Sequence, residues 1–152
     1  GKVNAVITQN IDGLHSRAGV PDDRLIEIHG NATYATCLDC GRRSELAEAE
    51  AAIVATGRSP RCACGGLVKA AVISFGQAMP TREMERAEHA IQEADLFVAV
   101  GSSLTVQPAA SLPMIAKYDG ARLVIVNGEE TPLDGLADRV LRGSIGTVFS
   151  AL

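Results

Sequence analysis

The sequence has 152 residues, 47% hydrophobic and 21% charged, which is the composition of a globular domain rather than a disordered chain. Its formal net charge of −4 argues against a protein that binds nucleic acid through a broad basic face. No apolar run approaches the roughly 20 residues of a membrane helix, and no charged and then apolar leader opens the sequence. We therefore expect a cytoplasmic protein that binds neither nucleic acid nor a membrane directly.

The first residues of the sequence already predict a buried strand. Residue 1 is Gly, and Val3–Thr8 is apolar and β-branched. Natural domains usually begin with a few loose polar residues. We therefore expect that an upstream part of the protein is missing, and a processed N-terminus or the remnant of a tag is the alternative explanation.

The first half of the chain predicts short elements separated by loops. A brief apolar stretch stops at His29-Gly30, where glycine permits a sharp change of chain direction. The predicted elements are a strand over Val3–Thr8, a helical turn near Leu14–Ala18, the apolar stretch Leu25–Ile28, an Ala- and Glu-rich helix over Glu45–Ala55 and a strand over Leu67–Ser74.

The second half alternates regularly between strands and helices. The predicted elements are a helix from Thr81 to about Glu93, strands over Leu96–Val100 and Arg122–Val126, a helix near Pro108–Tyr118, a short strand at Val140-Leu141 and a helical segment over Ile145–Leu152. Alternation of helices with buried apolar strands predicts an α/β fold with a Rossmann-like, doubly wound parallel sheet. Ligands bind such sheets beyond the carboxyl ends of the strands.

Four cysteines fall in two close pairs. Cys37-x2-Cys40 is followed, after 21 residues, by Cys62-x-Cys64. Two such pairs on turns can supply the four tetrahedral sulfur ligands of a structural zinc ion, which leave the metal no open position. Two disulfides, buried thiols or a redox pair are the alternatives. We predict that residues 33–66 form a zinc-binding module, inserted into a larger domain of residues 1–32 and 67–152.

Polar groups follow several predicted strands. Thr8-Gln9-Asn10-Ile11-Asp12 brings amides and a carboxylate that suit ribose hydroxyls or a carboxamide, although a capped turn explains them equally well. Gly101-Ser102-Ser103 offers backbone amides and hydroxyls for a phosphate or ribose. His29 is placed to act as a base, with a hydrogen-bonded structural histidine as the alternative. The ordinary dinucleotide fingerprint G-x-G-x-x-G is absent from the sequence.

Taken together, these segments resemble the sirtuins, the NAD-dependent protein-lysine deacylases. The resemblance rests on ordered motifs over nearly the whole chain: Thr8–His15 (TQNIDGLH), Ile28-His29-Gly30, the two cysteine pairs, Phe75–Pro80 (FGQAMP), Gly101–Pro108 (GSSLTVQP), Val126–Glu129 (VNGE) and Gly143-Ser144-Ile145.

The resemblance implies a role for each matching residue. His29 would be the general base that acts on the ribose hydroxyls. The cofactor-binding residues would be Gln9, Asn10, Ile11 and Asp12 around nicotinamide and its ribose, and Gly101, Ser102, Ser103, Asn127, Gly128, Glu129 and Ile145 around the adenosine half. Ile73, Ser74, Phe75 and Gly76 would pair with an acyl-lysine protein or peptide by strand addition. The implied products are free lysine, nicotinamide and O-acyl-ADP-ribose.

The sequence departs from the family pattern in two places. Gln77 stands where the family usually has Glu, which would alter substrate contacts. The family's N-terminal Gly-Ala-Gly-Ile-Ser segment, with its part of the cofactor site, is not in the sequence, so we expect the 152-residue chain by itself to show little or no turnover. Mono-ADP-ribosyl transfer by the same site and a non-catalytic zinc-ribbon interaction module are the alternative functions.

Overall fold

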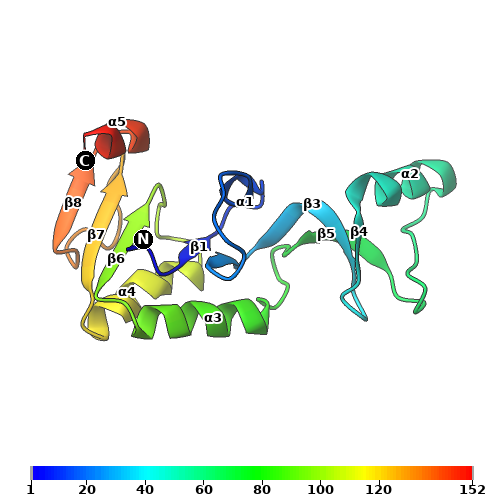
Figure 1. The fold of residues 1–152 in the computed structure, drawn as a ribbon, viewed down its shortest axis with the longest axis horizontal. Helices are drawn as coiled ribbons and strands as arrows, with labels where there is room; N and C mark the ends of the chain where they lie inside the picture. Colours follow the sequence, from blue (N-terminus) through cyan, green and yellow to red (C-terminus); the bar gives the residue numbers. More distant parts are fainter. Residues whose placement is uncertain (1, 152) are drawn as a thin grey trace. The chain divides into compact units, whose positions relative to one another are not determined.

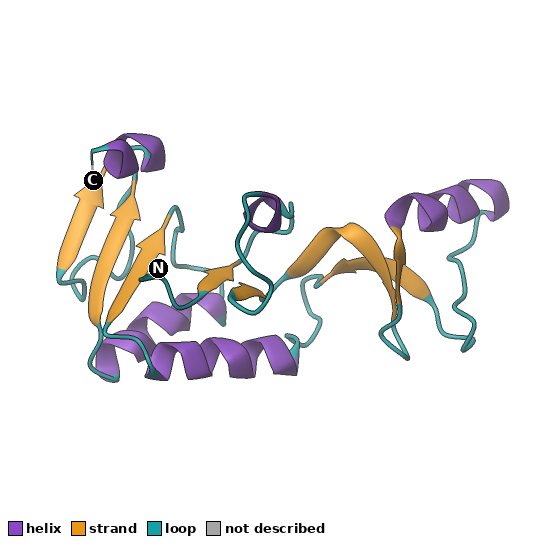
Figure 2. Cartoon of the chain, in the orientation of Figure 1, coloured by secondary structure: helices purple, strands orange, loops and turns teal. Residues whose placement is uncertain are grey.

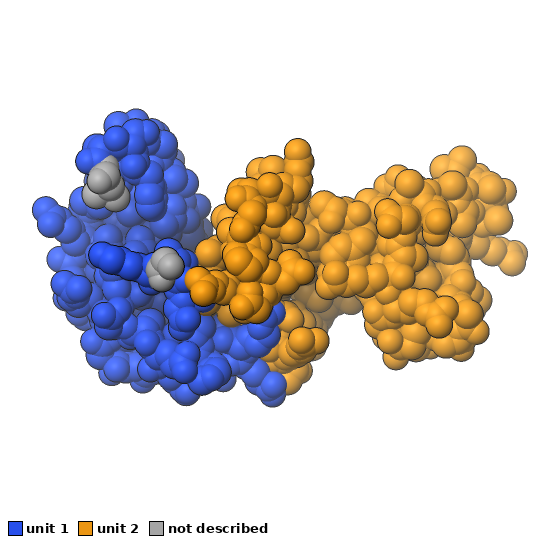
Figure 3. Space-filling view, viewed as in Figure 1, with its two compact units in different colours: residues 1–4, 85–152 blue, residues 5–84 orange. Residues whose placement is uncertain are grey.

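The computed structural model describes residues 2–151, and the chain divides into two compact units (Figure 3). One unit comprises residues 5–84, and the other comprises residues 1–4 and 85–152. Within the described residues, no helix combines the length and the apolar character needed to cross a membrane.

The unit of residues 5–84 begins with a pair of short parallel strands. β1 (Val6–Thr8) pairs with β2 (Leu25–Glu27), with Val6 opposite Leu25 and Thr8 opposite Glu27. The short helix α1 (Leu14–Arg17) lies between them in the chain. β1 is shorter than the predicted Val3–Thr8, because pairing with β2 begins only at Val6.

A small antiparallel sheet carries the cysteines. β3 (Gly30–Cys37) lies between β4 (Arg43–Glu45) and β5 (Val68–Val72), so β5 is an edge strand among the described residues. The predicted helix is confirmed as α2 (Leu46–Thr56), which packs against this sheet. The core beneath it consists of small side chains, namely Ala35, Cys37, Ala49 and Val68 with the half-buried Leu46 and Cys62.

The other unit contains the predicted parallel sheet. β6 (Leu96–Val100), β7 (Arg122–Asn127) and β8 (Arg139–Arg142) pair in this order, all parallel, and lie side by side in Figures 1 and 2. The remaining helices are α3 (Thr81–Gln92), which crosses the boundary between the units, the 3-10 turn η1 (Ala109–Ser111), α4 (Leu112–Tyr118), which packs against β6 and β7, and α5 (Ile145–Ser150).

The prediction that Leu96–Val100 is a buried strand is wrong for one of its faces. Leu96, Val98 and Val100 are 43%, 42% and 39% exposed. The other face, with Phe97 and Ala99, belongs to the core. An apolar run therefore does not guarantee that both faces of a strand are covered by other elements.

Asp138 ties α4 to the start of the sheet. Its carboxylate accepts hydrogen bonds from Lys117 Nζ at 2.6 and 2.7 Å and from the Leu123 N–H at 2.7 Å. The Lys117 ammonium, followed by the Leu123 N–H, lowers the pKa of Asp138 below its usual value. The acid is therefore held ionised, and its contacts stabilise the fold above the unfolded-state pKa and are lost as the pH falls through the folded-state value.

Candidate active site

His29 lies between β2 and β3, where its ring contacts the backbone of the loop after β1. Nδ1 of His29 is 3.2 Å from the carbonyl oxygen of Gln9. A carbonyl can only accept, so this contact requires the proton of the neutral ring on Nδ1. The lone pair of the neutral imidazole is then on Nε2, where it can accept a proton. The structure thus brings together Gln9 and His29, which the sequence analysis connected only through the resemblance.

The backbone of His29 also contacts the segment predicted to bind substrate. The Ile73 N–H donates to the His29 carbonyl oxygen at 2.9 Å. The next residue, Gly30, has a φ of 77°, and a Cβ at this position would lie 2.0 Å from the carbonyl oxygen of Ala71. Only glycine allows β5 to approach the histidine this closely.

Gly30→Ala is therefore expected to destabilise the chain strongly. The left-handed backbone costs a non-glycine residue about 1–3 kcal/mol, and the contact with the Ala71 carbonyl adds to that cost. Gly57→Ala is the matched control. Gly57 has a similar φ of 66°, but a Cβ added to it would have no described atom within 4 Å apart from its chain neighbours and the backbone of α2. Urea unfolding should show a loss for Gly30→Ala that exceeds the loss for Gly57→Ala by at least about 1 kcal/mol. Equal losses would contradict the steric argument.

The loop after β1 folds back on the start of β3. The Ala32 N–H donates to the Ile11 carbonyl at 2.7 Å, and the Asn10 N–H donates to Thr8 Oγ1 at 3.1 Å. Asp12 accepts the Leu14 N–H at 3.0 Å and so closes the turn before α1. This is the capped turn that the sequence left open, and it gives Asp12 a structural contact besides its predicted role.

Two polar residues beside His29 were not singled out in the sequence. Asn31 is 6% exposed, and its Nδ2 donates to Glu27 Oε1 at 2.7 Å. Asn31 Oδ1 accepts from the N–H and the hydroxyl of Thr33 at 2.7 and 2.6 Å. These bonds fix the chain on both sides of the histidine. No local pattern in the sequence indicated the contact between Glu27 and Asn31, because the turn between them brings these two residues together. That turn comprises Ile28-His29 and the left-handed backbone of Gly30, which has a φ of 77°.

Ile73–Gly76, the segment predicted to bind substrate, directly follows the edge strand β5. It enters a turn in which the Gln77 N–H donates to the Ser74 carbonyl at 3.0 Å. Gly76 has a φ of 84°, and Phe75 is 99% exposed. The edge strand β5 thus leads directly into an exposed turn that carries Phe75, and an edge strand is the kind of element to which a peptide can add as a further strand.

The remaining predicted cofactor residues gather at the carboxyl edge of the parallel sheet. The Gly101 N–H donates to the Val126 carbonyl at 2.9 Å, which places the end of β6 beside Asn127. Gly101 has a φ of 61°, and a Cβ on it would lie 2.6 Å from Cδ1 of Ile145. Gly101 and Ile145 are thus neighbours, and any side chain at residue 101 would overlap the end of the Ile145 side chain unless that side chain moved.

The loop after β7 is held by residues that the sequence analysis missed. Arg142 donates to the Glu129 carbonyl at 2.8 Å and also binds the Asp134 carboxylate. Thr131 donates to Asp134 through its hydroxyl at 2.6 Å and its N–H at 3.2 Å. The Thr131 hydroxyl and N–H, then Arg142, lower the pKa of Asp134. This network fixes the segment that carries Asn127, Gly128 and Glu129.

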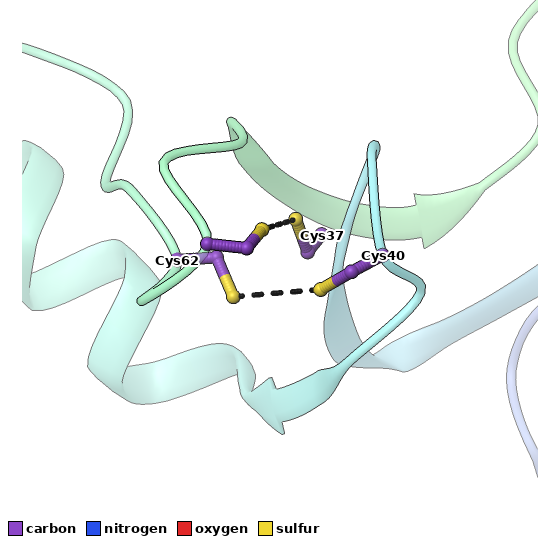
Figure 4. A group of neighbouring side chains, drawn as sticks. Cys37, Cys40 and Cys62 are labelled. Carbon is purple, nitrogen blue, oxygen red and sulfur yellow. Dashed lines mark hydrogen bonds between the residues drawn. The ribbon is translucent and has the colours of Figure 1, made fainter.

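The four cysteine sulfurs form one cluster, in which all ligand atoms lie within 4.8 Å of one another (Figure 4). Cys37 Sγ is 3.5 Å from Cys64 Sγ, and Cys40 Sγ is 3.7 Å from Cys62 Sγ. Tetrahedral zinc with bonds of about 2.3 Å separates its sulfurs by about 3.8 Å. The four cysteines are therefore arranged to bind a zinc ion, as predicted, and the sulfurs are not joined as disulfides.

The surroundings of the cluster act in opposite directions on two of its sulfurs: they lower the pKa of Cys37 and raise the pKa of Cys64. The N–H of Cys40 donates to the Cys37 sulfur and lowers the pKa of Cys37 to about 7. The Gly66 N–H lowers the pKa of Cys64, but the thiols of Cys40 and Cys37 together with desolvation raise it to about 12. A dication at the centre would favour the thiolate at every position. Gly66 is required here, since a Cβ would lie 2.6 Å from Cys37 Sγ.

Comparison with known proteins identifies the class to which this fold and these residues belong. The profile of the Sir2 family matches residues 1–108. The chain therefore belongs to the Sir2 family, the sirtuins, and its Rossmann-like α/β fold is confirmed by the similar solved structures.

Two similar proteins are named for the same activity, and two similar solved structures contain peptides. An NAD-dependent protein deacetylase of Rhodopseudomonas palustris is 52% identical over 147 residues, which are 96% of this chain and 58% of the relative. One of Haloarcula marismortui is 45% identical over 153 residues, covering 100% of this chain and 58% of the relative. The structure of Sir2Tm bound to a propionylated peptide has a TM-score of 0.85 at 35% identity, and covers 97% of this chain and 61% of that one. A Sir2 structure with a p53 peptide and NAD+ has a TM-score of 0.84 at 35% identity, and covers 97% and 60%.

The chain thus spans about 58% of the length of these relatives. The predicted residues fall into two groups, one in each unit. His29, Gln9–Asp12 and Ile73–Gly76 lie in residues 5–84, whereas the residues assigned to adenosine lie in the other unit.

Proposed function

We propose that this chain carries the catalytic base and the binding residues of an NAD-dependent protein-lysine deacylase. The observation that carries the proposal is the contact of His29 Nδ1 with the Gln9 carbonyl, together with the bond from Ile73 to the His29 carbonyl. One histidine thereby joins the segment assigned to nicotinamide and the segment assigned to the peptide.

NAD is the proposed cosubstrate, and it would supply the ribose carbon that receives the acyl oxygen and the nicotinamide that leaves. Gln9, Asn10, Ile11 and Asp12 would hold the nicotinamide ribose. The residues proposed for the adenosine half are Gly101, Ser102, Ser103, Asn127, Gly128, Glu129 and Ile145. The position of Gly101 against Ile145, at the carboxyl edge of parallel strands, supports this assignment.

An acyl-lysine peptide is the proposed second substrate. It would pair with Ile73, Ser74, Phe75 and Gly76, which directly follow the edge strand β5. The peptides bound in the similar solved structures support this choice. The Nε2 lone pair of His29 would take the proton of a ribose hydroxyl, so that this oxygen can attack the acyl carbon.

The zinc ion would be structural, because four cysteine ligands leave no open position for a reaction. We also retain as proposals the division into a zinc-binding module of residues 33–66 and a domain of residues 1–32 and 67–152. Free thiols at all four cysteines suit a reducing compartment and support the proposed location in the cytoplasm.

A chimera tests the proposed activity at the length of the relatives. In this chimera, the aligned residues of this chain replace the 147 matched residues of the Rhodopseudomonas palustris relative. We expect it to release acetyl groups from an acetyl-lysine peptide only in the presence of NAD, with one nicotinamide and one O-acetyl-ADP-ribose formed per lysine freed. The 152-residue chain assayed alone is expected to show little or no turnover.

Mass spectrometry of the peptide separates the competing functions. Nicotinamide release with the acetyl group retained on lysine would favour ADP-ribosyl transfer. A zinc-loaded and folded chimera that neither releases nicotinamide nor removes the acetyl group would overturn the proposed activity and favour an interaction module.

A further inference from the structure

Two polar side chains meet beside the Ile73–Gly76 segment. Lys69, on β5, places Nζ 2.8 Å from Gln77 Oε1 and 2.9 Å from the carbonyl oxygen of Val72. Gln77 Oε1 also accepts the Ser74 N–H at 2.8 Å. Gln77 thus bonds Ser74 twice, through its own N–H and through its side-chain oxygen. Lys69 connects this turn to the edge strand β5.

The turn has little else to order it. Residues 74–78 are exposed, and Phe75 is 99% exposed, so the segment gains almost nothing from a packed core. A segment held this weakly loses conformational entropy when a peptide pairs with it, and that loss weakens binding. Contacts that order the segment beforehand remove part of the loss.

We propose that Lys69 and Gln77 are positioning residues that pre-order the Ile73–Gly76 segment for an acyl-lysine peptide. This inference rests on the proposed function and adds two residues to it. Gln77 acts here through its oxygen alone, accepting from an ammonium and from an amide. A carboxylate could accept both bonds with the same shape and more strongly, because charge-assisted hydrogen bonds are the stronger kind. The neutral glutamine at residue 77 therefore makes a weaker contact than glutamate would.

Steady-state kinetics of the chimera with an acetyl-lysine peptide test the proposal. Gln77→Leu removes the acceptor and is expected to raise the KM for the peptide about five- to tenfold, with kcat nearly unchanged. Lys69→Met is expected to act similarly, and the double variant should be no worse than the poorer single variant. Gln77→Glu is expected to keep the KM at or below its original value. Gln92→Leu, at an exposed position near the end of α3, is the matched control.

Hydrogen exchange of the Ser74 amide provides a readout that does not depend on turnover. Its exchange is expected to be faster in Gln77→Leu than in the unaltered protein, and as slow or slower in Gln77→Glu. If the chimera is active and Gln77→Leu changes neither its KM for the peptide nor the exchange of the Ser74 amide, this inference is wrong while the proposed function stands. A chimera without NAD-dependent deacetylation would instead overturn the proposed function.

Discussion

Replacing His29 by alanine should lower NAD-dependent deacetylation by the chimera about a hundredfold to ten-thousandfold, which is the usual contribution of a positioned general base. The fold should persist, since the backbone carbonyl that accepts the Ile73 N–H remains in the variant. Turnover of an acetyl-lysine peptide measures the first effect, and circular dichroism with thermal unfolding measures the second.

His89→Ala is the control for this experiment, because His89 lies exposed on α3. Its turnover should match that of the unaltered chimera. A well-folded His29→Ala variant with full turnover would show that the imidazole is only a structural contact of Gln9, which is the alternative that the sequence left open.

Removing one cysteine ligand should cost the chain both its zinc ion and the structure of its antiparallel sheet. The core there has few large side chains, and two of its members, Cys37 and Cys62, are themselves ligands. Such a core gains little from burial, so metal binding has to supply the folding free energy, on the order of 10 kcal/mol for structural zinc sites. We expect one zinc ion per chain in the unaltered protein and almost none in Cys62→Ala.

Elemental analysis and hydrogen exchange over β3, β4 and β5 measure these two losses. Ala63→Ser changes the exposed residue between two ligands and should affect neither. A Cys62→Ala variant that retains slow exchange across these strands would contradict the role of the metal. So would an unaltered protein that is folded there without zinc.

Local sequence patterns predicted where the strands and helices of this protein lie better than they predicted which faces of those elements are buried. The apolar runs that end in Gly101 and Asn127 are strands of a parallel sheet, as their lengths and boundaries indicated. The exposure of Leu96, Val98 and Val100 was not predictable, because burial of a strand face depends on elements distant in sequence.

In the candidate site, too, contacts between residues distant in sequence were harder to predict than local patterns. The cysteine spacing predicted the metal cluster, because two close pairs of one ligand type form a recognisable pattern, and a tetrahedral zinc site requires the two pairs to meet. The contact between Gln9 and His29 joins residues 20 positions apart and left no local signal. The bonds of Arg142 to the loop after β7 were equally hidden, since an arginine near a strand end is usually only a solvated charge.

The open edge of β5 also affects how this protein behaves in concentrated solution. Backbone amides and carbonyls at a sheet edge can template aggregation with another copy of the chain, in the same way as they would pair with the proposed peptide. Two such groups of β5 are already bonded, because the Val68 N–H donates to the Pro60 carbonyl at 2.9 Å and Lys69 Nζ donates to the Val72 carbonyl at 2.9 Å. The strand is short, at five residues, and carries a lysine, two features that discourage such self-association. If the proposed peptide pairs with this edge, purification in its presence should also reduce self-association.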